Sequence, residues 1–346
     1  MAPIKSSLAK SAKQLLGFFN TADLGLRGAT QISRRVPPDP IDASGGTKIS
    51  SSPSVHYHVF VSDSPFVVTT GGEADIFLVA GGGGSSTSLA AGGGAGGAVH
   101  VTGTTLTSGV TYSVVVGAGG AENNVSAPSS STGNSGANST FTHPGDSTVL
   151  TALGGGYGAS YATNNAANGG CGGGTETGAP DTGGLGQQPS QAQPFHTSYG
   201  GTLNQYGNDG NQAVAPTGNF GGGGGGTGGG GSTSKTGGDA QPFSDFPAPV
   251  LAPAIPSGPV RTRWTSEVGP TGLFGGGGGG GARDGHTAGK GGTGGGGDGY
   301  NTTGQESSDG ADYTGGGGGS GSYPFSPGEN GKGGNGIVIV RYVDPS

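Results

Sequence analysis

The sequence has few of the residues on which ordinary protein cores depend. Its 346 residues include one cysteine, one methionine and one tryptophan, and only 29% of them are hydrophobic. Because Cys171 stands alone, an intrachain disulfide is excluded and the fold needs no oxidising compartment. No apolar run approaches the roughly 18 residues of a membrane-spanning helix, so we expect no membrane insertion.

Charged residues are scarce as well. They make up 10% of the chain, with a net charge of −7. A nucleic-acid-binding protein needs a basic patch, so we expect no nucleic acid partner. Low charge also argues against disorder of the kind that high net charge produces.

Recognisable catalytic motifs are missing. The fragment GHTAGKGG resembles a phosphate-binding loop, but Asp284 and Gly291 stand where that motif needs glycine and Ser or Thr. Dinucleotide-type glycine patterns arise by chance at this glycine content and lack a strand-to-helix context. No Ser, His and Asp set or carboxylate pair stands out. We therefore expect no enzyme and no cofactor.

One histidine pair was considered for a metal site. His56 and His58 alternate with apolar residues, which places both imidazoles on one face of a strand. Neutral imidazole is a common metal ligand, and three such pairs could surround an ion on a trimer axis. The ordinary interpretation is two histidines on a solvated strand face, so the sequence predicts no metal site.

Glycine is what the chain has in abundance. There are 86 glycines, against about 7% in an average protein. Many form uninterrupted runs, at residues 81–84, 92–94, 154–156, 221–226, 228–231, 275–281, 294–297 and 315–319. Ordering glycine costs about 0.5–1 kcal/mol more than ordering alanine, so these runs fold only where their backbone groups find partners.

The remaining residues predict β-strands between the glycine runs. Clusters of β-branched and aromatic residues lie at 55–61, 66–69, 74–80, 98–102, 111–116, 148–152 and 337–343. The last strand lies far from the others in sequence, so the glycine-rich middle must bring the chain back to the sheet. Polyglycine can form a left-handed threefold helix whose N–H and C=O groups point outward, and parallel rods of this kind can bond to one another.

These observations predict a mainly β fold with irregular structure. We expect a short N-terminal helix, an antiparallel β-sandwich-like lobe and a polyglycine-II-like bundle. The expected domains are residues 1–45 as a docking segment and spacer, 46–153 as the β-rich lobe, and 154–346 as the glycine-rich region with its closing strand.

Three passages carry a family resemblance. ADIFLVAGGGG at 74–84, AGGGAGGAVHVTGTTLTSGVTYSVVVGAGG at 91–120 and GGNGIVIVRY at 333–342 resemble the glycine-rich domain of phage virion proteins, in tail fibres and other appendages, of marine phages in particular. The resemblance covers residues 55–343. It implies a structural or adhesive component located in the virion, and rod bundles in phage adhesins are a weaker similarity.

The N-terminal region predicts a short basic amphipathic helix. Apolar residues fall at helical spacing, with Lys5, Lys10 and Lys13 outside the stripe. A polar, basic stretch and the stiff VPPDP spacer follow. The helix could fold back on the β-lobe, lie on a membrane surface or dock into another virion protein. We favour docking, through Leu8, Leu15, Leu16, Phe18, Phe19, Arg34 and Arg35.

Two sets of residues are candidate receptor contacts. The first lies in the proline-rich segment 241–274, which holds Arg263 and Trp264 and is interpreted either as a loop covering the bundle or as a contact surface. The second is formed by tyrosines in polar loops, a composition typical of adaptable binding loops: Tyr157, Tyr161, Tyr199 and Tyr206.

The function expected from the sequence is that of an outward-projecting virion appendage subunit, a fibre or a head or tail decoration. It would contact other virion proteins through its N-terminus and form a homo-oligomer, with a trimer favoured. The alternative is a receptor-binding adhesin that contacts a host glycan or protein through the aromatic loops. A third class, an extracellular glycine-rich matrix protein, predicts a secretion signal that we do not find.

Overall fold

The structure is a computed structural model that describes residues 40–52, 54–86, 91–123, 132–160, 165–176, 183–213, 219–230, 235–283, 285–300, 306–321 and 330–344. Residues Pro40–Asp344 form one compact unit. The expected boundary between residues 153 and 154 falls inside this unit. The predicted N-terminal helix lies outside the described residues.

The described elements follow the order of the glycine runs. The strands are β1 (Asp42–Ser44), β2 (Thr47–Ser50), β3 (Val55–Phe60), β4 (Ser64–Thr70), β5 (Gly72–Val79), β6 (Ala98–Leu106), β7 (Val110–Val115), β8 (Ser139–Thr142), β9 (Val149–Ala152), β10 (Thr202–Tyr206), β11 (Gln241–Pro242), β12 (Leu273–Phe274) and β13 (Ile337–Val343). The helices are η1 (Gln188–Ser190), α3 (Pro194–Tyr199), α4 (Ala248–Leu251), η2 (Ala252–Ala254) and α5 (Pro259–Val268).

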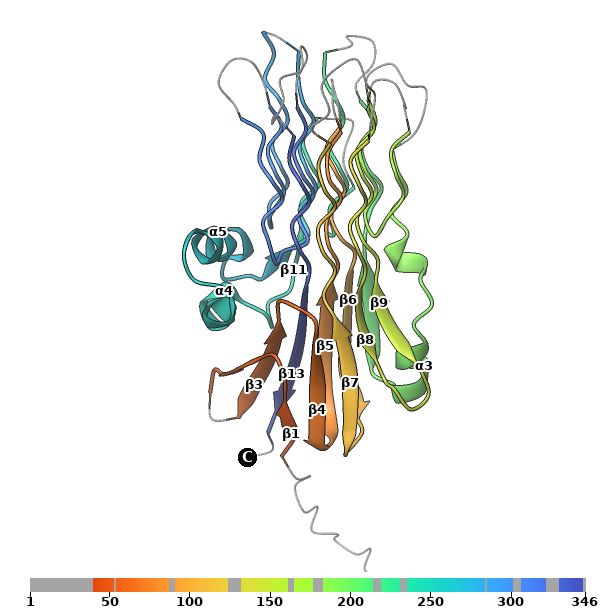
Figure 1. The fold of residues 1–346 in the computed structure, drawn as a ribbon, viewed down its shortest axis with the longest axis vertical. Helices are drawn as coiled ribbons and strands as arrows, with labels where there is room; N and C mark the ends of the chain where they lie inside the picture. The colour runs from red at the N-terminus through yellow and green to blue at the C-terminus, as the bar shows by residue number, and fades with distance from the viewer. Residues whose placement is uncertain are drawn as a thin grey trace, which may run out of the picture. The chain divides into compact units, whose positions relative to one another are not determined.

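Two antiparallel sheets form a sandwich (Figure 1). The five-stranded sheet has the order β1-β4-β7-β8-β9, and the six-stranded sheet has the order β10-β6-β5-β13-β3-β2. The closing strand β13 lies between β5 and β3, with Ile339 opposite both Phe77 and Val59. A buried apolar cluster that includes Phe66, Tyr112 and Phe141 fills the space between the sheets.

The proline-rich segment 241–274 covers the outer face of the six-stranded sheet. Phe246, Trp264 and Phe274 form a second buried cluster there with Phe77 of β5. The segment was predicted as a loop, and this was wrong for its second half, which forms α5. Pro259 occupies the first turn and Gly269 caps the end of α5, which is the proline-first, glycine-last pattern of helices.

Glutamine side chains close one edge of the sandwich. The backbone N–H of Thr151 on β9 donates to Gln193 Oε1 at 2.8 Å, and its carbonyl accepts a bond from Gln193 Nε2 at 2.8 Å. Gln188 Oε1 accepts the N–H of Leu153 at 2.6 Å. These bonds occupy backbone groups that an edge strand would otherwise offer to another chain.

The glycine segments form threefold rods that continue the strands. In segment 91–97, three successive N–H groups donate to three different neighbours, and the fourth returns to the first neighbour. The donor–acceptor pairs are Gly92–Gly222, Gly93–Gly318, Gly94–Gly156, Ala95–Gly225, Gly96–Gly315 and Gly97–Leu153. A period of three residues is that of the polyglycine or polyproline II helix.

The rods are packed so that an interior rod is bonded on all sides. Segment 81–86 exchanges backbone hydrogen bonds with segments 91–97, 117–123, 132–138, 153–160, 315–321 and 330–336. A Cβ atom on Gly93 would overlap the carbonyl oxygen of Gly83 in the next rod. Side chains are excluded from such positions because the backbones themselves are in contact, as at the axis of collagen.

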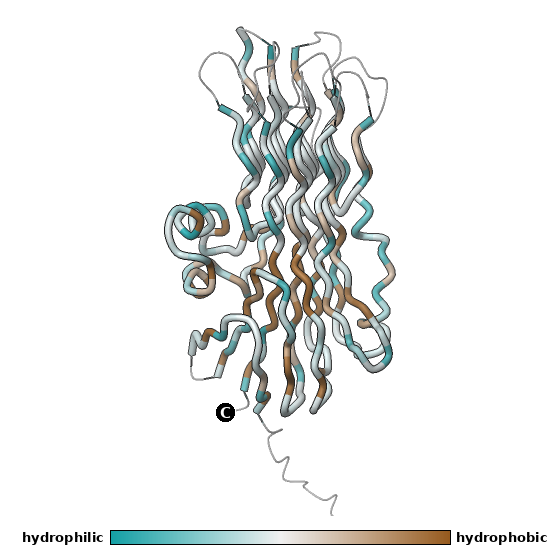
Figure 2. Tube along the Cα trace, in the orientation of Figure 1, coloured by the Kyte–Doolittle hydropathy of each residue, from teal (hydrophilic) through white to brown (hydrophobic). Residues whose placement is uncertain are grey.

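The hydropathy of the chain follows this division. Figure 2 shows hydrophobic residues gathered in the sheets, whereas the rods are near neutral. The predicted mainly β fold with a polyglycine-II-like bundle is confirmed, and all seven predicted strand regions contain a strand. Strands β1, β2, β8 and β10 were not predicted, because each is short and rich in polar residues.

Candidate functional site

The two ends of the described unit differ in structure. Strands β5, β7 and β9 run directly into rods at their C-terminal ends, and β6, β8 and β13 are entered from rods. At the opposite end of the sheets, Asp42 pairs with Thr70 and Val343 pairs with Val55. Pro40 and Asp344, where the described chain starts and stops, therefore lie at the sheet end, away from the rod tips (Figure 1).

Aspartate and asparagine side chains join the outer rods. We call these contacts Asx bridges: an Oδ1 atom on one rod accepts a backbone N–H of the next rod, at distances of 2.7 to 3.4 Å. The bridges are Asn138–Gly154, Asn168–Leu185, Asp209–Gly186, Asp239–Thr293, Asp298–Gly291, Asp309–Lys332, Asp312–Asn335 and Asn335–Gly119. They supply partners that outer rods do not obtain from a neighbouring backbone.

Small polar side chains fill the array near the rod tips. Ser85 and Ser86 are fully buried; Ser85 Oγ donates to Gly331 O at 3.1 Å, and Ser86 Oγ donates to Gly158 O. Asn330 Nδ2 donates to Asn123 O at 2.6 Å and so connects two rods that are far apart in sequence. This buried polar layer ends the glycine region and supports the rod tips.

A cationic and aromatic cluster lies at one group of rod tips. Lys235 Nζ is 4.8 Å from the centroid of the Phe220 ring, and the Phe220 and His286 rings meet edge to face at 5.3 Å. Lys235 also donates to Thr287 Oγ1 at 2.7 Å. Partial burial lowers the pKa of Lys235. The sequence analysis missed this cluster, because its members come from three different rods.

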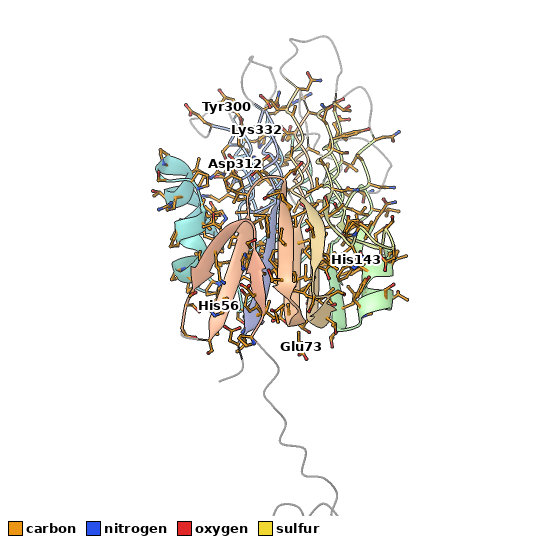
Figure 3. The ribbon with its side chains drawn as sticks, turned by 60° about the horizontal axis from the view of Figure 1, so that its bottom comes forward. His56, Glu73, His143, Tyr300, Asp312 and Lys332 are labelled. Atoms are coloured by element: carbon orange, nitrogen blue, oxygen red, sulfur yellow. The ribbon has the colours of Figure 1, made fainter. Side chains whose placement is uncertain are left out.

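The predicted contact tyrosines do not form one surface. Tyr157 lies partly exposed within rod 153–160, whereas Tyr206 ends β10 and meets the Phe243 ring edge to face at 5.2 Å. Tyr199 lies on α3 at the sheet end, where its hydroxyl donates to Asp146 Oδ2 at 2.6 Å. Tyr161 lies outside the described residues. Tyr300, near a rod tip, points outward in Figure 3.

Trp264 and Arg263 have structural contacts. The Trp264 side chain is completely buried, and its Nε1 donates to the carbonyl of Tyr313 at 3.0 Å. Arg263 is half-buried and donates to Asp309 O at 2.6 Å. Trp264 was proposed from the sequence as a receptor contact, and the structure corrects this: the indole packs under α5 and offers no surface to a ligand.

The two candidate metal ligands are engaged within the chain. His56 Nδ1 lies 2.8 Å from Ser50 Oγ and its Nε2 lies 2.9 Å from Asp344 Oδ2. His58 Nδ1 lies 2.8 Å from Gly45 O and its Nε2 lies 3.2 Å from the Tyr342 hydroxyl. Both rings lie near Tyr342, so they share a face as predicted. That face is not solvated, since His58 is fully buried, and burial lowers the pKa of His58.

The remaining expectations can be compared only in part. Leu8, Leu15, Leu16, Phe18, Phe19, Arg34 and Arg35 lie outside the described residues. Within the described ranges, no helix has the length and hydropathy needed to cross a bilayer. The same ranges contain no group of three His, Cys, Asp or Glu side chains arranged to hold a metal ion.

Comparison with known proteins identifies a family. A search of curated proteins finds no match. A family model described as a glycine-rich domain matches residues 62–343, which includes β4 to β13 and every rod described above. The chain therefore belongs to this glycine-rich domain family.

Proposed function

We propose that this protein is a structural subunit of a phage virion, an appendage of the fibre or decoration type that is attached through its N-terminus. The observation that carries the proposal is the polarity of the unit. Residues 1–39 join the described unit at Pro40, at the sheet end, while the rods extend from the opposite end. This arrangement suits a protein that is held at one end and projects the other.

The rod array suits a projecting part on physical grounds. Its cohesion comes from backbone hydrogen bonds between rods, so it needs few large side chains and no disulfide. The proposal also rests on the resemblance of segments 74–84, 91–120 and 333–342 to phage virion proteins. Other virion proteins are the proposed partners, the virion is the proposed location, and the subunit is proposed to be a homo-oligomer without chemistry of its own.

Incorporation into particles tests this proposal. The variant Leu15→Asp/Leu16→Asp in the full chain places charge on the apolar stripe of the predicted helix, and Lys10→Asp, outside the stripe, is the matched control. The double variant should fold but be missing from purified particles, while the control is incorporated. Normal incorporation of the double variant, or absence of the wild-type chain from particles, contradicts the proposal.

A receptor-binding adhesin is the second candidate. The partly exposed Phe220 and Tyr300 at the rod tips favour it, because aromatic side chains are enriched at binding hot spots. Competition of purified protein with phage adsorption separates the two functions. Inhibition that is lost in Phe220→Ala/Tyr300→Ala supports the adhesin, and the absence of inhibition at high protein concentration supports a purely structural part.

A further inference from the structure

One side of the molecule has no ionisable side chain, and we propose that this side binds a second copy of the same chain. It consists of the outward-facing residues of β4, β7, β8 and β9 together with exposed residues of rods 117–123 and 132–138. We call it the uncharged face. Its members are Pro65, Val67, Thr69, Thr111, Ser113, Val115, Ala118, Ala121, Asn134, Ser135, Ala137, Asn138, Thr140, Thr142, Val149 and Thr151.

Strand register arranges these residues in rows across the sheet. Ser113 on β7 is opposite Pro65 on β4 and Thr142 on β8, and Thr142 is opposite Val149. Val67 and Val115 are each 37% exposed, among the most exposed large hydrophobic residues of the described chain. The rows therefore present methyl and hydroxyl groups, which pack without the desolvation penalty of a buried charge.

The two sheets differ in what covers them. The outer face of the six-stranded sheet is buried under α4 and α5. No described element covers the outer face of the five-stranded sheet, because η1 and α3 close its edge instead, through Gln188 and Gln193.

Charge favours a second copy as the occupant. The chain carries a net charge of −7, so two copies repel one another through most surfaces. Asp42, Asp63, Glu122 and Asp146 stand at the margins of the uncharged face. The Asp63 carboxylate accepts the N–H of Val116 at 2.8 Å, and Asp146 accepts the Tyr199 hydroxyl. A charged partner would find no counter-charge on the face, whereas an identical uncharged face matches it.

The size of the face is sufficient for a stable contact. The six residues of β7 extend about 20 Å, and rod 117–123 adds about 20 Å. Four strands spaced about 4.8 Å apart give a width of about 19 Å. The product is about 800 Å², close to what each partner contributes to a standard interface. One contiguous patch that binds itself gives a two-fold dimer, rather than the trimer expected from the sequence.

The association state of the purified full-length chain tests this inference. Ser113→Asp places a carboxylate at the centre of the rows, and Ser266→Asp, at an exposed position of α5, is the matched control. Sedimentation velocity over a wide concentration range measures the dimer dissociation constant. We expect a wild-type dimer, an unchanged control, and an increase of at least about a hundredfold in the dissociation constant for Ser113→Asp, since like charges brought together across an interface are strongly unfavourable.

Three results would overturn the inference. They are a wild-type chain that stays monomeric, including one whose own residues 1–39 cover the face; a trimer; or an oligomer that Ser113→Asp leaves intact. Thermal unfolding verifies that each variant is folded, and Ser113→Thr, which adds no charge, should keep the dimer. The inference deepens the proposed homo-oligomer. Because the assay uses purified chain, its failure is distinguishable from failed incorporation into particles.

Discussion

Gly93 illustrates how single residues determine the rod array. Its N–H donates to Gly318, and its carbonyl accepts the N–H of Gly278, while the Gly83 backbone occupies the place of a side chain. Gly93→Ala should therefore lower the free energy of unfolding by about 3 kcal/mol, the upper range for overpacking a close-packed interior. Gly229 has open space where a Cβ would stand, so Gly229→Ala should be nearly neutral. Chemical denaturation measures both, and equal losses would contradict the packed array.

Asp298 represents the Asx bridges. Its Oδ1 accepts the N–H of Gly291 at 2.8 Å, a partly buried contact between neighbouring rods. Asp298→Ala removes the acceptor and should cost about 1–2 kcal/mol, whereas Asp298→Asn keeps a carbonyl oxygen in place and should cost much less. Urea unfolding of the two variants gives the comparison. If alanine and asparagine were equally tolerated, the bridge would contribute nothing to stability.

His58 makes stability depend on pH. Because burial lowers its pKa below 6.5, the unfolded chain binds a proton near that pH while the folded chain does not. Stability contributed by the neutral ring is complete above the unfolded pKa and declines as pH falls from there towards the folded pKa. Unfolding free energies at pH 7 and pH 5 should differ less in His58→Gln than in the wild type. His100, whose pKa burial also lowers, leaves some dependence in the variant. An unchanged pH dependence would exclude His58 as a source.

At the scale of elements, α5 acts as a cover for the six-stranded sheet. Trp264 is fully buried against Phe274, with ring centroids 6.1 Å apart, and its Nε1 bonds to Tyr313 O. Trp264→Ala should lower stability by about 3–5 kcal/mol, typical of aromatic truncation in a core. Val260→Ala, at a position 37% exposed on the same helix, is the control and should cost little. Thermal melts compare them, and a Trp264→Ala protein as stable as the control would mean that α5 does not cover the sheet.

The sequence predicted elements whose signals are local and missed those that depend on distant neighbours. Strands such as β5 and β13 are marked by their own β-branched residues, and the rods by their glycine runs. The Asn335–Gly119 bridge joins residues 216 positions apart, so nothing near either residue indicates it. The burial of Trp264 and His58 depends in the same way on packing partners from other elements.

For the candidate site, the sequence gave the chemistry of the tip residues but not their grouping. Phe220 was recognised as an aromatic beside a glycine run. Its contacts with Lys235 and His286 arise because the rods that carry these residues end side by side. Tyr199 looked similar in sequence, yet it lies at the sheet end because α3 returns there to close the sandwich.

At the scale of the whole molecule, the rods and sheets form one unit with a sheet end and a rod end. Figure 3 shows His56 and Glu73 at the sheet end and Tyr300 near the rod end. The proposed function assigns the sheet end to the particle and the rod tips to the exterior, because the chain enters the unit at Pro40.

A cryo-EM reconstruction of particles that carry this chain tests that assignment most directly. The account predicts density for the β-sandwich next to the particle surface, with the glycine rods extending away from it. Particles without the chain, or with rods that face inward and a sandwich that faces outward, would contradict it.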